Sequence, residues 1–164
     1  MAPAAPTRTV YLPSDPASSA QFREAGQLPP SPGISVDEAY AQARDLELAL
    51  ADDEEEADYW ALVDASVQGL HRTAAGPRFV LAARVRPEQL VPDGPAGSGR
   101  VLACGVSWGQ VSALFIDEHE ALEAVRAARE AVGDPLLLEE RVAGLLSEHE
   151  LLWYAPEELD ALLT

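Results

Sequence analysis

The chain has 164 residues, and 48% of them are hydrophobic, a share that is typical of a globular protein and too high for a disordered acidic tail. Its 28 acidic residues outnumber eleven cations, all of them Arg, and the formal net charge is −17. Because these arginines are scattered, we expect the protein to bind neither nucleic acid nor an anionic membrane surface.

The chain begins with a predicted strand and a short helix. Apolar side chains alternate over residues 7–13, which favours a strand. The helix starts from a cap at Ser14 or Asp15, with Pro16 at its first position, and Gly26 ends it. Both predictions rest on residues within the element itself or directly next to it.

A loop and two helices are predicted next. The segment LPPSPG, residues 28–33, is typical of a loop. Ser35 and Glu38 have the spacing of a capping box, which predicts a helix over residues 35–50. The helix predicted over 51–72 begins with a run of acids, and Asp52 or Asp53 is expected to cap it. Its inward stripe is expected to be Trp60, Val63, Val67 and Leu70.

The middle of the chain predicts strands separated by a long loop. Residues 77–87 have the β-branched and aromatic content of a strand. Residues 87–99 are rich in Pro and Gly, and we expect them to form a mobile surface loop. Two short strands are predicted over 101–106 and 111–116, with a turn at Trp108 and Gly109 between them.

The C-terminal part predicts two helices, a strand and a last helix. Asp117 and Glu120 form a capping box for a helix that ends at Gly133, and Asp134 starts another that ends at residue 148. Residues 149–155 are apolar on both faces, which predicts a strand placed centrally in the sheet or covered on both sides. The helix after this strand is expected to close over the core with Leu159, Leu162 and Leu163.

These elements predict one α+β domain over residues 1–164, in which residues 1–7 are disordered. We expect a mainly antiparallel sheet of four to five strands with its helices packed on one face. The order of elements suggests a ferredoxin-like βαββαβ arrangement with additions.

Several segments also resemble a known family. They are VYLP (10–13), EEADYWALVDAS (55–66), VLAARV (80–85), VSWGQVSALFID (106–117), and EHELLWY (148–154) with ELDALL (158–163). In this order they resemble a family of uncharacterised small acidic proteins from actinobacteria, and HELLWY is the most specific piece. The resemblance implies one compact domain in the cytoplasm and no particular reaction.

Candidate ligand-binding residues centre on two histidines. His119 and His149 each stand between two glutamates, and such a histidine could act as an acid, a base or a ligand. With Glu150 and Tyr154 they form the candidate set. The alternative is that His149 is a partly buried side chain that anchors the entry to the last strand. No metal, cofactor or catalytic residue is predicted, because no motif has the required spacing.

The leading hypothesis is a cytoplasmic, non-catalytic module that contacts a protein partner or a second copy of itself. Cys104 is the only cysteine, and no apolar run resembles a signal peptide or a membrane span. One alternative is an enzyme or small-molecule binder with a site near His149, Glu150 and the 87–99 loop. Another is an acidic DNA mimic, with which the net charge is compatible.

Overall fold

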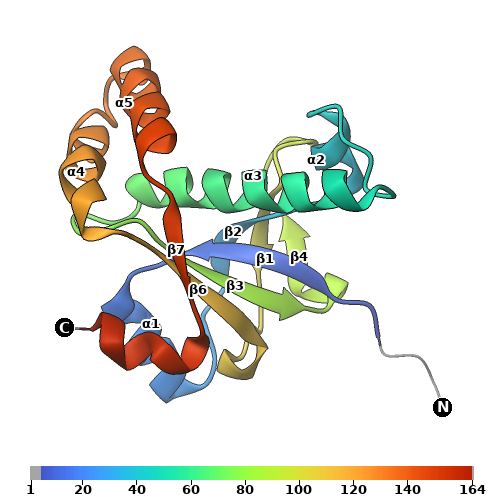
Figure 1. Ribbon diagram of the computed structural model, residues 1–164. Helices are drawn as coiled ribbons and strands as arrows, with labels where there is room; N and C mark the ends of the chain where they lie inside the picture. The colour runs from blue at the N-terminus through green and yellow to red at the C-terminus, as the bar shows by residue number, and fades with distance from the viewer. Residues whose placement is uncertain (1–4, 164) are drawn as a thin grey trace.

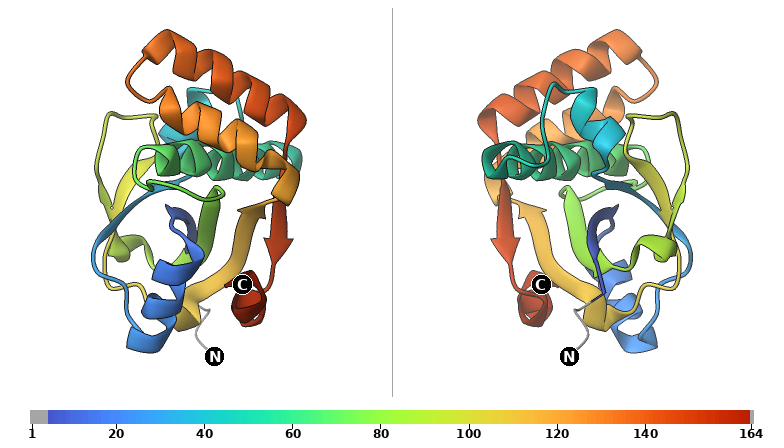
Figure 2. Two further views of the ribbon diagram at one scale, coloured as in Figure 1. Left: turned by 90° about the vertical axis from the view of Figure 1, so that its left-hand side faces the viewer. Right: turned by 90° about the vertical axis from the view of Figure 1, so that its right-hand side faces the viewer.

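The computed structural model describes residues 5–163 and shows a seven-stranded sheet with helices on both faces (Figures 1 and 2). The strand order is β4-β5-β2-β1-β3-β6-β7, and every neighbouring pair is antiparallel. The strands are β1 (Arg8–Pro13), β2 (Ser31–Ser35), β3 (Phe79–Val85), β4 (Leu90–Pro92), β5 (Arg100–Ala103), β6 (Val111–Asp117) and β7 (Leu151–Tyr154). The helices are α1 (Pro16–Ala25), α2 (Glu38–Gln42), α3 (Ala51–Leu70), α4 (Leu122–Glu130) and α5 (Pro135–Glu148), and short 3₁₀ segments are η1 (Pro87–Gln89), η2 (Trp108–Gln110), η3 (His119–Ala121) and η4 (Pro156–Leu162).

Helix α3 runs across one face of the sheet, as Figure 1 shows. Its Ala61 and Ala65 pack on Tyr11, Val80 and Ala82 of the strands beneath. Small side chains at the contact let the helix backbone lie close to the sheet, so alanines rather than large residues form much of its buried face.

The predicted inward stripe of α3 is therefore partly wrong. Val63 and Leu70 are buried as expected, but Val67 is only partly buried and Trp60 is 39% exposed. The indole of Trp60 stacks edge-on against Tyr59, with ring centroids 5.4 Å apart. The expected Asp cap is also absent, because Leu50 occupies the N-cap position without a side-chain hydrogen bond.

The other face of the sheet is covered by α1 and η4. Phe22 of α1 and Leu159 of η4 are buried in one cluster with the side chains of Leu12, Leu81 and Leu114. The start of α1 is as predicted: Asp15 caps it, Pro16 follows, and Gly26 ends it in the left-handed conformation. The prediction that helices cover one face is wrong, because both faces of the strands are apolar and each needs cover.

Helices α4 and α5 form a hairpin that stands beside the C-terminal end of α3 (Figure 1). Leu70 of α3, Val125 of α4 and Leu145 of α5 are buried together in a separate cluster. Asp134 caps α5 as predicted. The hairpin is thus joined to the body of the protein by a small apolar contact of its own.

Strand β2 lies where a loop and the start of a helix were predicted. Pro32 is tolerated there because β1 pairs only with Ile34 and Ser35, while β5 pairs with the earlier residues of the strand. A Cβ at Gly33 would lie 2.7 Å from the carbonyl oxygen of Tyr11, so only glycine fits. The predicted capping box at Ser35 is also wrong, because Ser35 ends β2 and Asp37 caps the short α2.

Residues 87–99 contain more structure than predicted. They include η1 and the edge strand β4, which pairs with β5. Arg44 donates a hydrogen bond of 3.2 Å to the carbonyl oxygen of Gly97 and ties the end of the segment to the residues after α2. Its mobility stays a prediction, and so does disorder at residues 1–7, of which residues 1–4 lie outside the described part of the chain.

Asp117 ends β6 and is buried, instead of capping a helix as predicted. Its carboxylate accepts bonds from Nη2 and the backbone N–H of Arg78, at 2.6 and 2.7 Å. The same guanidinium donates to the hydroxyl of Ser66 on α3 at 3.4 Å and to the carbonyl oxygen of His149 at 3.3 Å. One ion pair therefore links β3, β6, α3 and the start of β7.

Strand β7 lies at the edge of the sheet and not at its centre, so its predicted position is wrong. Leu152 is 41% exposed and Trp153 is 61% exposed. In the segment that follows, Leu159 is buried as predicted, whereas Leu163 is exposed.

The α+β class and the antiparallel sheet are confirmed. The sheet has seven strands instead of four to five. The ferredoxin-like arrangement is not confirmed. There, a helix joins two parallel strands that have another strand between them, whereas here α1 joins β1 and β2, which are direct neighbours and antiparallel.

We predict that Asp117→Ala lowers the free energy of unfolding by ~3–5 kcal/mol, because it leaves the buried guanidinium of Arg78 without its partner. Urea unfolding of the two proteins measures the difference. Glu88→Ala is the control: it breaks an exposed ion pair with Arg86 and should cost less than about 1 kcal/mol. Equal effects of the two substitutions would contradict the central role of the buried pair.

A second prediction compares the contributions of β7 and η4 to stability. Trp153→Ala should change the unfolding free energy by no more than ~0.5 kcal/mol, because the indole is mostly exposed. Leu159→Ala should cost about 2–5 kcal/mol, because its side chain is fully buried. A large loss of stability for Trp153→Ala in the same unfolding experiment would place the indole in the core instead.

Candidate functional site

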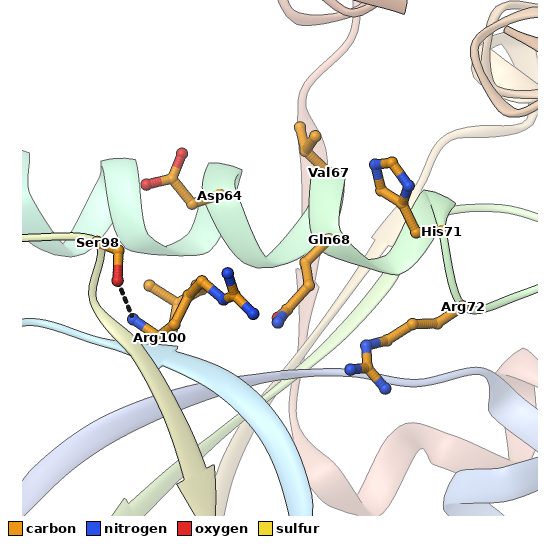
Figure 3. Close-up of a pocket in the computed structure, with 8 residues that line it drawn as sticks. Asp64, Val67, Gln68, His71, Arg72, Ser98 and Arg100 are labelled. Carbon is orange, nitrogen blue, oxygen red and sulfur yellow. Dashed lines mark hydrogen bonds between the residues drawn. The ribbon is translucent and has the colours of Figure 1, made fainter. Parts of the chain in front are cut away.

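A large hollow lies between the C-terminal half of α3 and the strands β2 and β5; we call it the arginine pocket (Figure 3). It measures about 860 Å³ and opens to solvent. Helical spacing places Asp64 and Gln68 of α3 along it, followed by His71 at the C-cap of the helix, because residues three and four apart share a helix face. The full lining is Ile34, Asp64, Val67, Gln68, His71, Arg72, Ser98 and Arg100.

The acid of this pocket is already neutralised. The hydroxyl of Tyr40 donates to the Asp64 carboxylate at 2.6 Å, and Arg44 donates to the same oxygen at 3.0 Å. The guanidinium of Arg44 also stacks over the Tyr40 ring, 3.5 Å from its centroid. Burial, and then the bond to Asp64, raises the pKa of Tyr40, so its hydroxyl remains a donor. In Figure 3 the carboxylate of Asp64 points away from Gln68 and Arg100.

Two guanidinium groups of the arginine pocket have no partner in the described chain. Arg72 and Arg100 donate no side-chain hydrogen bond within residues 5–163, and the same holds for Arg141 on α5, which lies outside the pocket. The other arginines each donate a hydrogen bond to an oxygen atom or form an ion pair with a carboxylate. In Figure 3, Arg72 and Arg100 extend toward Gln68 from opposite sides.

Gln68 brings an unsatisfied polar atom to the same place. Its Oε1 is buried and accepts no hydrogen bond from the described residues. A buried acceptor without a donor costs about 1–3 kcal/mol, so such atoms are rare in folded proteins. The arginine pocket therefore holds two free cationic donors and one free acceptor.

A second, smaller pocket of about 330 Å³ contains two of the predicted site residues, and we call it the histidine pocket. His149 and Glu150 line it together with Arg78. The rest of its wall is mostly apolar: Tyr59, Leu62, Val63, Leu146 and Leu151.

His149 also anchors the junction between α5 and β7. Its ring Nδ1 lies 2.9 Å from Oε1 of Glu118. Its backbone N–H donates to the carbonyl oxygen of Leu145 at 3.0 Å, and its backbone carbonyl oxygen accepts a hydrogen bond from Arg78. The same residue thus lines a pocket and fixes the entry to the last strand.

The other predicted site residues do not join this group. His119 is exposed in η3 and lines neither pocket, and Tyr154 packs on the opposite face of the sheet. Ser98, from the 87–99 segment, lines the arginine pocket, so the predicted site near both His149 and this segment is divided between two pockets.

Sequence reasoning missed Glu118, although one signal was present. The two Glu-His-Glu segments, 118–120 and 148–150, do not act separately, because Glu118 of the first binds His149 of the second. The pocket arginines were missed because nothing in the sequence shows which cations lack partners. Within residues 5–163 no three His, Cys, Asp or Glu side chains are placed to hold a metal ion. In the same part of the chain, no helix combines the length and apolarity needed to cross a membrane.

We predict a pH-dependent effect at Asp58, a half-buried residue of α3 that faces the Tyr11 hydroxyl. Burial is the main cause that raises the pKa of Asp58, so the folded protein keeps this proton at a pH where the unfolded chain has lost it. Stability from this residue is therefore fully present below the unfolded pKa and falls as pH rises through the folded pKa. The unfolding free energy of Asp58→Asn should therefore increase relative to that of the native protein as pH rises, because the asparagine side chain carries no titratable proton to lose. Urea unfolding across the acidic range measures this gain, and a constant difference would contradict it.

Comparison with known proteins identifies the family. No curated protein matches the chain, and no solved structure matches it. A family model described as "Family of unknown function (DUF6912)" matches residues 8–163, from the first residue of β1 to the residue after η4. The chain therefore belongs to the DUF6912 family of unknown function.

Proposed function

We propose that the protein is a non-catalytic interaction module that binds an extended segment of a partner protein along the free edge of β7. The observation that carries this proposal is the exposure of Leu152 and Trp153, at 41% and 61%, on a terminal strand. Strands at a sheet edge present unpaired backbone N–H and C=O groups, and an added strand satisfies them.

The two edges of the sheet differ in a way that supports binding at β7. Strand β4, at the opposite edge, has three residues and ends in Pro92, which has no N–H to donate. Strand β7 contains Leu151, Leu152, Trp153 and Tyr154, with no proline and no charge among them. Natural proteins usually protect an edge with proline or charge, and β7 is protected by neither.

The histidine pocket adds a place for a side chain. It opens beside Leu151, the first residue of β7, and its wall includes Leu62 and Leu146. Strand addition draws affinity from backbone hydrogen bonds and specificity from pockets that take alternate side chains. An apolar residue of the added segment fits this pocket, and Glu150 at the same pocket favours a cationic neighbour.

Charge favours a basic partner over a second copy. The exposed acids Glu148 and Glu150 precede β7, and Glu157 follows it. If two β7 strands paired antiparallel, acids before one strand would lie beside acids after the other and repel them. A segment with Arg or Lys around an apolar centre meets opposite charge at both ends of β7.

Selection of phage-displayed random peptides against the full chain tests this proposal. Enriched peptides should have an apolar centre with Arg or Lys on both sides of it, and their binding should weaken as salt rises. Trp153→Lys and Leu152→Lys should each weaken the binding of a synthetic enriched peptide about tenfold or more, because each places a cation in the apolar contact with a basic peptide. Amides of β7 should exchange more slowly with solvent when the peptide is bound.

Val91→Lys is the matched control, because Val91 is an apolar residue 49% exposed on β4 at the other edge. This substitution should leave peptide affinity unchanged. Peptides that bind Trp153→Lys as well as the native chain would refute the proposal. A dimer of the free chain in light scattering, dissolved by Trp153→Lys, would place a second copy at β7 instead.

A further inference from the structure

We propose that the arginine pocket binds a small organic anion in which an oxyanion group, carboxylate or phosphate, lies near a hydroxyl. This site is separate from the β7 edge: it lies at the C-terminal half of α3 by β2 and β5, toward the opposite end of the sheet. A test of one proposal therefore does not decide the other.

The positive charge of the pocket is unusual in so acidic a chain. Acids outnumber arginines 28 to eleven, yet Arg72 and Arg100 bind no carboxylate of the described chain. The acid in the pocket, Asp64, is held by Arg44 and Tyr40. What remains is a pair of guanidinium groups, whose planar N–H donors match carboxylate and phosphate oxygens.

The orphan oxygen of Gln68 defines the second part of the ligand. Oε1 accepts hydrogen bonds, and Figure 3 shows the carboxamide between the two arginines. Neither an inorganic anion without a proton to donate nor a simple carboxylate satisfies this oxygen. A ligand hydroxyl near the oxyanion group donates to Oε1 while the guanidinium groups bind the charge.

The neighbouring residues leave room for such a molecule. The hydroxyl of Ser98 is already used, because it donates to the carbonyl of Pro95 at 2.6 Å and accepts from the N–H of Arg100 at 3.3 Å. Val67 and Ile34 supply apolar surface. A volume of about 860 Å³ is within the range of pockets that hold metabolite-sized ligands.

Isothermal titration calorimetry of the full chain with two matched pairs of probes tests the inference at constant ionic strength. The pairs are malate with succinate, and glycerol 3-phosphate with methyl phosphate, and only the first member of each pair carries a hydroxyl. We expect the hydroxylated member to bind more tightly in at least one pair. The pair that binds more tightly identifies the oxyanion group.

Three substitutions locate the binding. Arg72→Gln and Arg100→Gln should each weaken the binding of the tighter probe about tenfold. Both positions are exposed, so folding should be retained. Gln68→Leu should abolish the preference for the hydroxylated probe and leave binding of the other member nearly unchanged. Arg141→Gln is the matched control, since it removes an unpaired arginine outside the pocket and should change nothing.

Two results would overturn the inference. One is the absence of binding by all four probes at millimolar concentration. The other is binding that Arg141→Gln weakens as much as Arg72→Gln and Arg100→Gln, because this would reflect general attraction of anions to arginine and not the pocket.

Discussion

The buried ion pair between Arg78 and Asp117 holds together parts of the chain that are far apart in sequence. It joins the residue before β3 to the end of β6, and the same guanidinium reaches Ser66 on α3 and the carbonyl of His149 before β7. Two opposite charges removed from water must satisfy each other, because each alone would be costly to bury. This contact helps to hold α3 and the start of β7 in place, and Arg78 also lines the histidine pocket.

Helix α3 serves three environments with different faces. Ala61 and Ala65 allow a close approach to the sheet, and Val67 with Gln68 lines the arginine pocket. Tyr59 and Leu62 form part of the histidine pocket on another side. A weakly amphipathic helix is the expected result, because each of these faces has its own chemistry. This explains why the apolar stripe in the sequence did not predict which side chains of α3 face the sheet.

Local signals in the sequence predicted the caps of α1 and α5 but not those of α2, α3 and α4, and long-range features were predicted poorly. Asp15, Pro16 and Gly26 act within one helix, so the bounds of α1 followed from them. The strand around Pro32 and Gly33 was invisible because its reasons lie in β1 and β5, which leave Pro32 unpaired on one side and press on Gly33. For the candidate site, His149 and Glu150 were identified, while Glu118, Arg72 and Arg100 depend on contacts that only the fold creates.

The difference between the two sheet edges also limits stoichiometry. A chain with two open edges could pair with neighbours on both sides and grow into a fibre without end. Here Pro92 and the shortness of β4 disfavour pairing at one side, so β7 is the one edge of the described sheet that is open to an added strand. Copies of a chain with one open edge can pair at most two by two through their sheets, so the exposed apolar strand does not by itself lead to a fibre.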